Sequence, residues 1–166
     1  VVAASAPGPV VVAANPPGDP AENPAVVVGV DGSEHTEEVL AFAFDYASRH
    51  DRRLHAIFCW HPDLLASMQW RMPPPAPERA ERWLAELAAG WQEKYPDVPV
   101  RRAVIREFPV SGLVAESLSQ ELLVVGNRSR HARAAALLGS VSQGVLHHAI
   151  CPVAVIHPRA VPATAR

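Results

Sequence analysis

The chain has 166 residues and a mass of 17.9 kDa, and 49% of its residues are apolar, which suffices for the core of one ordinary domain but not of two. Its 15 basic and 17 acidic residues leave a net charge of -2, which argues against a nucleic-acid-binding face. No run of about 18 apolar residues predicts a membrane span, and no signal-peptide pattern is present. We therefore expect a cytoplasmic protein without nucleic-acid or membrane partners.

The first 24 residues differ from the rest, because they hold six of the 17 prolines. We expect a proline-rich linker over residues 14–24, the main domain over residues 25–158 and a tail over residues 159–166.

The first half of the domain alternates strand-like and helical segments. Residues 25–30 are a continuous apolar run, typical of a strand buried on both faces. Ser33 is the expected N-cap of an amphipathic helix that ends near His50. A second strand is expected over 54–60, and a second helix over 78–95 after a proline-rich loop.

The second half continues the alternation. A strand is expected over 100–106, and Pro109 suits the first turn of a short helix. Residues 122–126 form another apolar run, a helix begins at Gly139-Ser140, and residues 152–156 form the last strand. This order predicts an α/β fold with a parallel sheet.

Ligands of open parallel sheets bind beyond the carboxyl ends of the strands, where the strand order reverses. Asp31 and Gly126 each end a predicted strand, and Gly139-Ser140 begins a helix after the second of them. Glycine lets the backbone approach a ligand closely, and helix N-terminal amides with a serine hydroxyl suit an anion. Because Arg128 and two further arginines add positive charge, we expect a phosphate group here. Neither a Gly-x-Gly-x-x-Gly fingerprint nor a P-loop pattern occurs.

Taken in order, four segments resemble the universal stress protein family: Val27-Val-Gly-Val-Asp-Gly-Ser33, Val124-Val-Gly-Asn-Arg-Ser-Arg130, Leu137-Leu-Gly-Ser-Val-Ser142 and Cys151-Pro-Val-Ala-Val155. The resemblance covers residues 25–157. It implies a Rossmann-like α/β fold, similar to adenine nucleotide alpha hydrolases, with a five-stranded parallel sheet of order 3-2-1-4-5, helices on both faces and dimerisation through the last strand. The family's ATP-binding members carry Gly-x2-Gly-x9-Gly followed by Ser or Thr, and an acidic residue that closes the first strand.

Carried over residue by residue, the resemblance implies an adenine nucleotide site, with ATP, with or without Mg²⁺, as the cofactor. The implied contacts are Gly29 and Asp31 near adenosine, Cys59 beside the base, Val125, Gly126, Arg128 and Ser129 along the nucleotide, and Gly139, Ser140, Val141 and Ser142 around the phosphates. One position departs, since Ser129 stands where the family has its second glycine. A side chain there hinders close approach of a phosphate or requires a backbone angle that costs about 1–3 kcal/mol.

We expect a nucleotide-dependent regulator of the stress response rather than a turnover enzyme, with at most weak ATP hydrolysis. No Ser-His-Asp arrangement, paired carboxylates or metal-ligand set can be tied to a site. The alternative is a family member that binds no nucleotide and acts through protein association, for which Ser129 is the supporting feature. A hydrolase of the related adenine nucleotide type is least favoured, because the Ser-Gly-Gly-x-Asp-Ser loop is absent after the first strand.

Residues 1–12 resemble residues 145–155, with Pro9 and Pro152 equivalent and 143 positions apart. One hypothesis is that residues 1–13 are the end of a preceding copy of the domain, so that the protein is a tandem repeat. Residues 9–13 would then form a strand beside 152–156. The edge from Pro152 to Ile156 would pair with a tandem sister domain or with a second chain in a homodimer. A chance likeness of short Val- and Ala-rich strings is the alternative.

Overall fold

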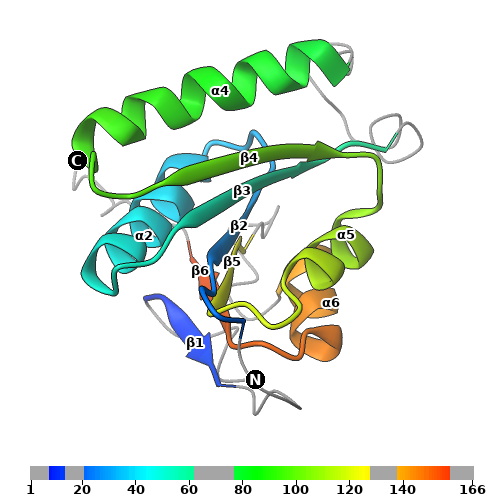
Figure 1. The fold of residues 1–166 in the computed structure, drawn as a ribbon. Helices are drawn as coiled ribbons and strands as arrows, with labels where there is room; N and C mark the ends of the chain where they lie inside the picture. Colours follow the sequence, from blue (N-terminus) through cyan, green and yellow to red (C-terminus); the bar gives the residue numbers. More distant parts are fainter. Residues whose placement is uncertain (1–7, 14–20, 62–76, 128–137, 158–166) are drawn as a thin grey trace, which may run out of the picture.

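The computed structural model describes residues 8–13, 21–61, 77–127 and 138–157 (Figure 1). In chain order the elements are β1 (Val10–Val12), β2 (Val26–Val30), α2 (Thr36–Arg49), β3 (Leu54–Cys59), α4 (Pro77–Lys94), β4 (Val100–Ile105), α5 (Pro109–Glu116), β5 (Leu122–Gly126), α6 (Ser140–His148) and β6 (Val153–Ile156). None of the helices in these ranges is long and apolar enough to cross a membrane.

The strands form one mixed sheet of six, in the order β1-β6-β5-β2-β3-β4. β2 through β6 pair in parallel, whereas β1 runs antiparallel to β6 with Val11 opposite Ala154. The expected sheet of five strands, all parallel, is therefore wrong for this chain, since the sheet has six strands and is mixed, whereas its five parallel strands, counted from β2, follow the order 3-2-1-4-5. The reason is that the N-terminal valine run adds a sixth strand to the edge that β6 leaves open. The structure thus places a strand within residues 9–13 beside 152–156, as the sequence predicted.

Helices cover both faces of the sheet, with α2 and α4 on one side and α5 and α6 on the other (Figure 1). Val26, Val28 and Val30 pack in the core beneath α2 and α4, and Val27 packs in the core beneath α5 and α6. Every residue of β2 except Gly29 is buried. Burial on both faces is the reason that this strand is a continuous apolar run rather than an alternating one.

Helix α2 begins three residues after the expected N-cap. Ser33 is not the N-cap residue: its backbone N–H donates to the Asp31 Oδ1 atom at 2.9 Å and its carbonyl accepts from the Thr36 N–H at 3.1 Å, so residues 33–36 form a turn that precedes the helix. His35 is the N-cap residue instead and makes no capping bond with its side chain. By contrast, Pro109 occupies the first turn of α5 as predicted, where its missing N–H costs no hydrogen bond.

Candidate functional site

The two central strands, β2 and β5, stop pairing before their carboxyl ends. Paired residues run only from Val26 opposite Leu122 to Val28 opposite Val124. On their outer sides the same strands remain paired further, β2 with β3 up to Val30 and β5 with β6 up to Gly126. The chain runs outward from β2 to β4 and returns through β5, so this separation lies where the strand order reverses. It is therefore the position at which α/β sheets bind ligands.

Asp31 follows β2 and organises the turn into α2. Its Oδ1 atom accepts hydrogen bonds from the Ser33 backbone N–H at 2.9 Å and from the Thr36 hydroxyl at 3.3 Å. Gly32 has a φ of 69°, a left-handed conformation that favours glycine. The half-buried Asp31 carboxylate is thus held at the carboxyl edge, on the β2 side of the separation.

Asn127 connects three elements at this edge, and only 4% of it is exposed. Its backbone N–H donates to the Ile156 carbonyl at 2.8 Å. Its side-chain Oδ1 accepts from the Gly139 N–H at 2.9 Å, and its Nδ2 lies 3.1 Å from the His157 Nδ1. The end of β5, the end of β6 and the beginning of α6 are therefore tied together through one amide.

The beginning of α6 carries the predicted phosphate contacts. Gly139 is its N-cap residue, in an extended conformation, and Ser140 and Val141 follow in the first turn. The first N–H groups of a helix lack intrahelical acceptors and lie at the positive end of the helix dipole. Ser142 is placed differently, because it is 1% exposed and its hydroxyl donates to the Gly139 carbonyl at 2.9 Å. Its hydroxyl therefore stabilises the first turn, and only its backbone N–H faces the helix start.

Three other predicted residues contribute their backbone rather than a side chain. A Cβ added to Gly29 would lie 2.8 Å from Cδ1 of Leu113 on α5, and one added to Gly126 would lie 3.0 Å from Cγ2 of Val39 on α2. The Val125 side chain is 2% exposed in the core beneath α5 and α6. Helix packing thus accounts for both glycines, and a ligand at these positions meets main-chain atoms.

Cys59 ends β3 at the same carboxyl edge, where it is 8% exposed, and its Sγ lies 4.0 Å from the Pro109 carbonyl oxygen. Burial, together with the negative charges of Glu107 and Glu116, raises the pKa of this thiol to about 12. Cys59 is therefore a neutral thiol at physiological pH, suited to apolar contact and not to nucleophilic or metal chemistry.

Two predicted contacts, Arg128 and Ser129, lie outside the described residues, and their roles remain predictions. Within the described ranges no cluster of three His, Cys, Asp or Glu side chains is placed to hold a metal ion.

Sequence reasoning missed Thr36, Asn127 and His157. Asn127 occupies a variable position of the Gly-x2-Gly-x9-Gly pattern, so the pattern does not single it out. A side-chain amide between a strand and a helix is nevertheless a suitable acceptor for a helix N–H, and this signal could have identified it. No sequence signal pairs it with His157, which lies 30 residues further along the chain.

The architecture is that of α/β domains that bind ligands at the carboxyl edge of a mainly parallel sheet. Residues 23–157 match the model of the universal stress protein family. The chain belongs to this family.

The chain is similar to several mycobacterial relatives. Universal stress protein Rv2005c of Mycobacterium tuberculosis is 44% identical over 137 residues, which are 82% of this chain and 46% of the relative. Universal stress protein Rv2623 of the same species is 42% identical over 130 residues, 78% of this chain and 44% of the relative. The chain spans about half the length of the curated relatives that it matches.

Solved structures of the family share the fold. A universal stress protein in complex with cAMP is 27% identical, with a TM-score of 0.61, covering 82% of this chain and 99% of that chain. A universal stress protein from Archaeoglobus fulgidus in complex with dAMP has a TM-score of 0.56 at 20% identity and covers 80% of this chain and 96% of that chain. The second likeness shows the fold alone.

Proposed function

We propose that this domain binds an adenine nucleotide, ATP with or without Mg²⁺, and acts in the cytoplasm as a nucleotide-dependent regulator of the stress response. The observation that carries the proposal is the separation of β2 from β5 between the Asp31 carboxylate and the N-terminus of α6. A relative of 27% identity that is solved with cAMP supports an adenine nucleotide as the ligand class.

The chemistry of the edge suits such a ligand. A carboxylate accepts hydrogen bonds from ribose hydroxyls, and Asp31 is fixed on the β2 side. The amides of the α6 start, with the exposed Ser140, offer donors to phosphate oxygens. Mg²⁺ usually binds through one or two carboxylates together with substrate phosphates, so Asp31 supplies one such group.

Regulation is favoured over turnover by the kind of groups at this edge. Among the described residues they are a carboxylate bonded to Ser33 and Thr36, a neutral thiol, helix amides and the His157 imidazole, whose Nδ1 is already hydrogen-bonded to the Asn127 amide. General acid–base catalysis requires positioned proton donors and acceptors with pKa values near the working pH. Binding without efficient hydrolysis is therefore the expected behaviour.

Mass spectrometry of nucleotide released from the purified chain, with calorimetric titration of ATP, tests this proposal. Asp31→Asn keeps an Oδ1 acceptor for Ser33 and Thr36 but removes the charge, so we expect an affinity loss of roughly tenfold with an unchanged melting temperature. Asp97→Asn is the matched control, because Asp97 is exposed and bonded to Ser48, away from this edge. If no binding is detected at millimolar ATP, the proposal is contradicted.

A second candidate function is association through the sheet edge at β6, with a tandem sister domain or a second chain as partner. Its support is that β6 accepts an antiparallel strand at its outer edge, here β1, and that Val11 and Val12 of this strand are 52% and 40% exposed, so that a partner strand would pair with β1 or replace it. Ser129 in place of the motif glycine favours this candidate over nucleotide binding. If Ser129→Gly gains ATP affinity that the natural chain lacks, association is the better description.

A further inference from the structure

A chain of hydrogen bonds runs from His157 through Asn127 to the start of α6, and its polarity is fixed. The Gly139 N–H can only donate, so the Asn127 atom facing it at 2.9 Å is Oδ1. The Nδ2 group then faces the His157 Nδ1 at 3.1 Å, and because Nδ2 can only donate, Nδ1 must accept. The observed arrangement therefore requires a neutral His157 with its hydrogen on Nε2.

Protonation of His157 is incompatible with this arrangement. The Nδ1–H of an imidazolium would face the Nδ2–H of Asn127, so two donors would meet. Turning the amide over lets Oδ1 accept from His157, but Nδ2 then faces the Gly139 N–H, which loses its acceptor. Two donors would be left side by side at the N-terminus of α6, where the helix dipole already favours an anion.

We propose that Asn127 is a positioning residue of the anion site and that His157 is its proton-sensitive partner. With His157 neutral, the Asn127 Oδ1 atom accepts the hydrogen bond of the Gly139 N–H. With His157 protonated, Asn127 releases that N–H and adds its own donor, so a phosphate oxygen binds more tightly. This proposal rests on the proposed function, since the phosphate belongs to the nucleotide placed there. By reciprocity, a bound phosphate favours the protonated form of His157.

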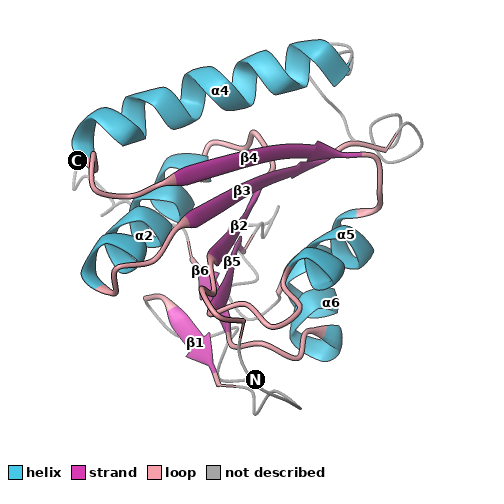
Figure 2. Ribbon diagram, in the orientation of Figure 1, coloured by secondary structure: helices cyan, strands magenta, loops and turns pink. Residues whose placement is uncertain are grey.

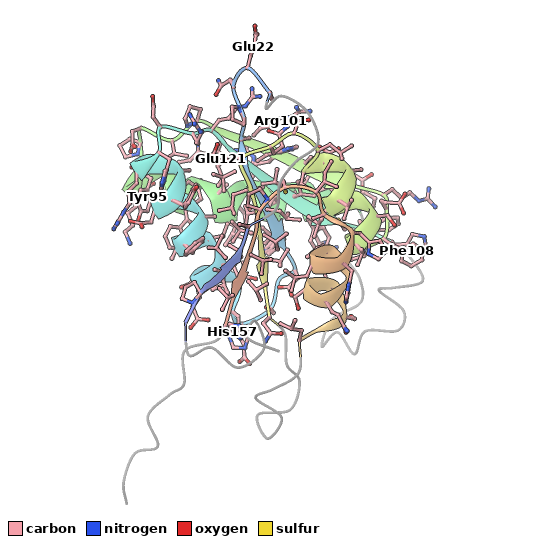
Figure 3. All side chains as sticks on the ribbon, turned by 90° about the horizontal axis from the view of Figure 1, so that it is seen from below. Glu22, Tyr95, Arg101, Phe108, Glu121 and His157 are labelled. Carbon is pink, nitrogen blue, oxygen red and sulfur yellow. The ribbon has the colours of Figure 1, made fainter. Side chains whose placement is uncertain are left out.

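The described residues around His157 include few other titratable groups. Figure 3 shows it at the end of the molecule opposite Glu121 and Arg101. Of the elements packed against β6, the strands β1 and β5 carry no titratable side chain, and α6 carries only two histidines in its last turn. Helix α2 brings the acidic residues Glu37 and Glu38 in its first turn, and the Glu38 Oε2 atom lies 3.4 Å from the His35 Nδ1 atom.

The first experiment follows the ligand-free chain by NMR. We expect the His157 ring to be the Nε2–H tautomer at pH 8, and the Gly139 amide signal to titrate with the same midpoint as His157. Asn127→Ala should abolish this shared midpoint. His148→Gln is the matched control, because His148 lies at the other end of α6, bonded to the Gly144 carbonyl. A Gly139 signal that ignores the His157 titration overturns the proposal.

The second experiment titrates ATP calorimetrically at pH 7.5, 6.5 and 5.5 into the natural chain and into His157→Gln. Dividing the affinity of the natural chain by that of His157→Gln at each pH removes the effect of protonation of the nucleotide phosphate itself, which is the same for both chains. We expect this ratio to rise as the pH falls, by up to about tenfold per pH unit, the limit for one linked proton. Equal pH profiles overturn the proposal.

A titration with inorganic phosphate distinguishes failure of the coupling between His157 protonation and phosphate binding, here called the linkage, from failure of the proposed nucleotide binding. If ATP binds at no pH while phosphate shifts the Gly139 amide more strongly at low pH, nucleotide binding fails and the linkage stands. If neither ligand binds, both fail.

Discussion

His55 is a buried histidine that the proposed site does not use. It lies on β3, is 7% exposed, and its Nδ1 is 3.7 Å from the Oε2 atom of Glu116 at the end of α5. Its Nε2 atom is buried without a hydrogen-bond partner in the described structure. Burial lowers the pKa of His55, and the positive charges of Arg101 and Arg53 act in the same direction against Glu116. The folded chain therefore binds a proton at this position less readily than the unfolded chain does.

This difference predicts loss of stability in mild acid. Below the unfolded histidine pKa of about 6.5, the unfolded chain takes up the proton first, so the free energy of unfolding decreases as the pH falls. The loss ends once the pH is below the folded pKa. His55→Leu should remove up to about 1.4 kcal/mol per pH unit from this slope. Urea unfolding between pH 7.5 and 5 measures it, with His148→Gln as control. Equal slopes in the natural chain and His55→Leu contradict the assignment.

Among the elements, α5 approaches the sheet closely because β2 has a glycine beneath it. Leu113 of α5 is 3% exposed, and its Cδ1 would lie 2.8 Å from a Cβ on Gly29. Gly29→Ala should therefore force the helix or the leucine to move, at a cost of about 1–3 kcal/mol in unfolding free energy. Gly90→Ala is the control, since a Cβ there meets nothing within 4 Å on the exposed side of α4.

The control should change stability in the opposite direction, because alanine in a helix interior is favoured over glycine by about 0.5–1 kcal/mol. Chemical denaturation of the two variants measures both changes. A Gly29→Ala variant as stable as the natural chain would show that α5 is not held against β2 as described.

Sequence patterns predicted the elements because burial and proline chemistry act locally. The apolar run of β2 and the position of Pro109 both follow from rules that span a few residues. The start of α2 was misplaced because a turn closed by the Ser33 carbonyl and the Thr36 N–H comes before the helix, and the sequence pattern does not distinguish this turn from a first helical turn. In the site, topology alone indicated Asp31 and Gly139. The inward turn of the Ser142 hydroxyl depends on contacts that sequence spacing does not encode.

At the scale of the whole molecule, the sheet has two unequal edges (Figure 2). β4 ends one side, and its exposed Arg101 and Arg102 discourage pairing with another chain. On the other side β6 is apolar and entirely buried, and β1 covers it with three residues. Closure of this edge therefore depends on a very short strand.

Removal of residues 1–13 should expose the β6 edge and increase self-association relative to the natural chain. Both core clusters are formed without β1, so the domain is expected to stay folded. An uncovered apolar edge strand pairs readily with its own copy, and a two-fold axis makes that pairing antiparallel, as β1 is now. Sedimentation velocity measures the mass. Removal of residues 1–7 alone retains β1 and should leave the mass unchanged. If all three chains sediment alike, β1 does not control association, because an edge that behaves identically with and without its cover is not closed by it.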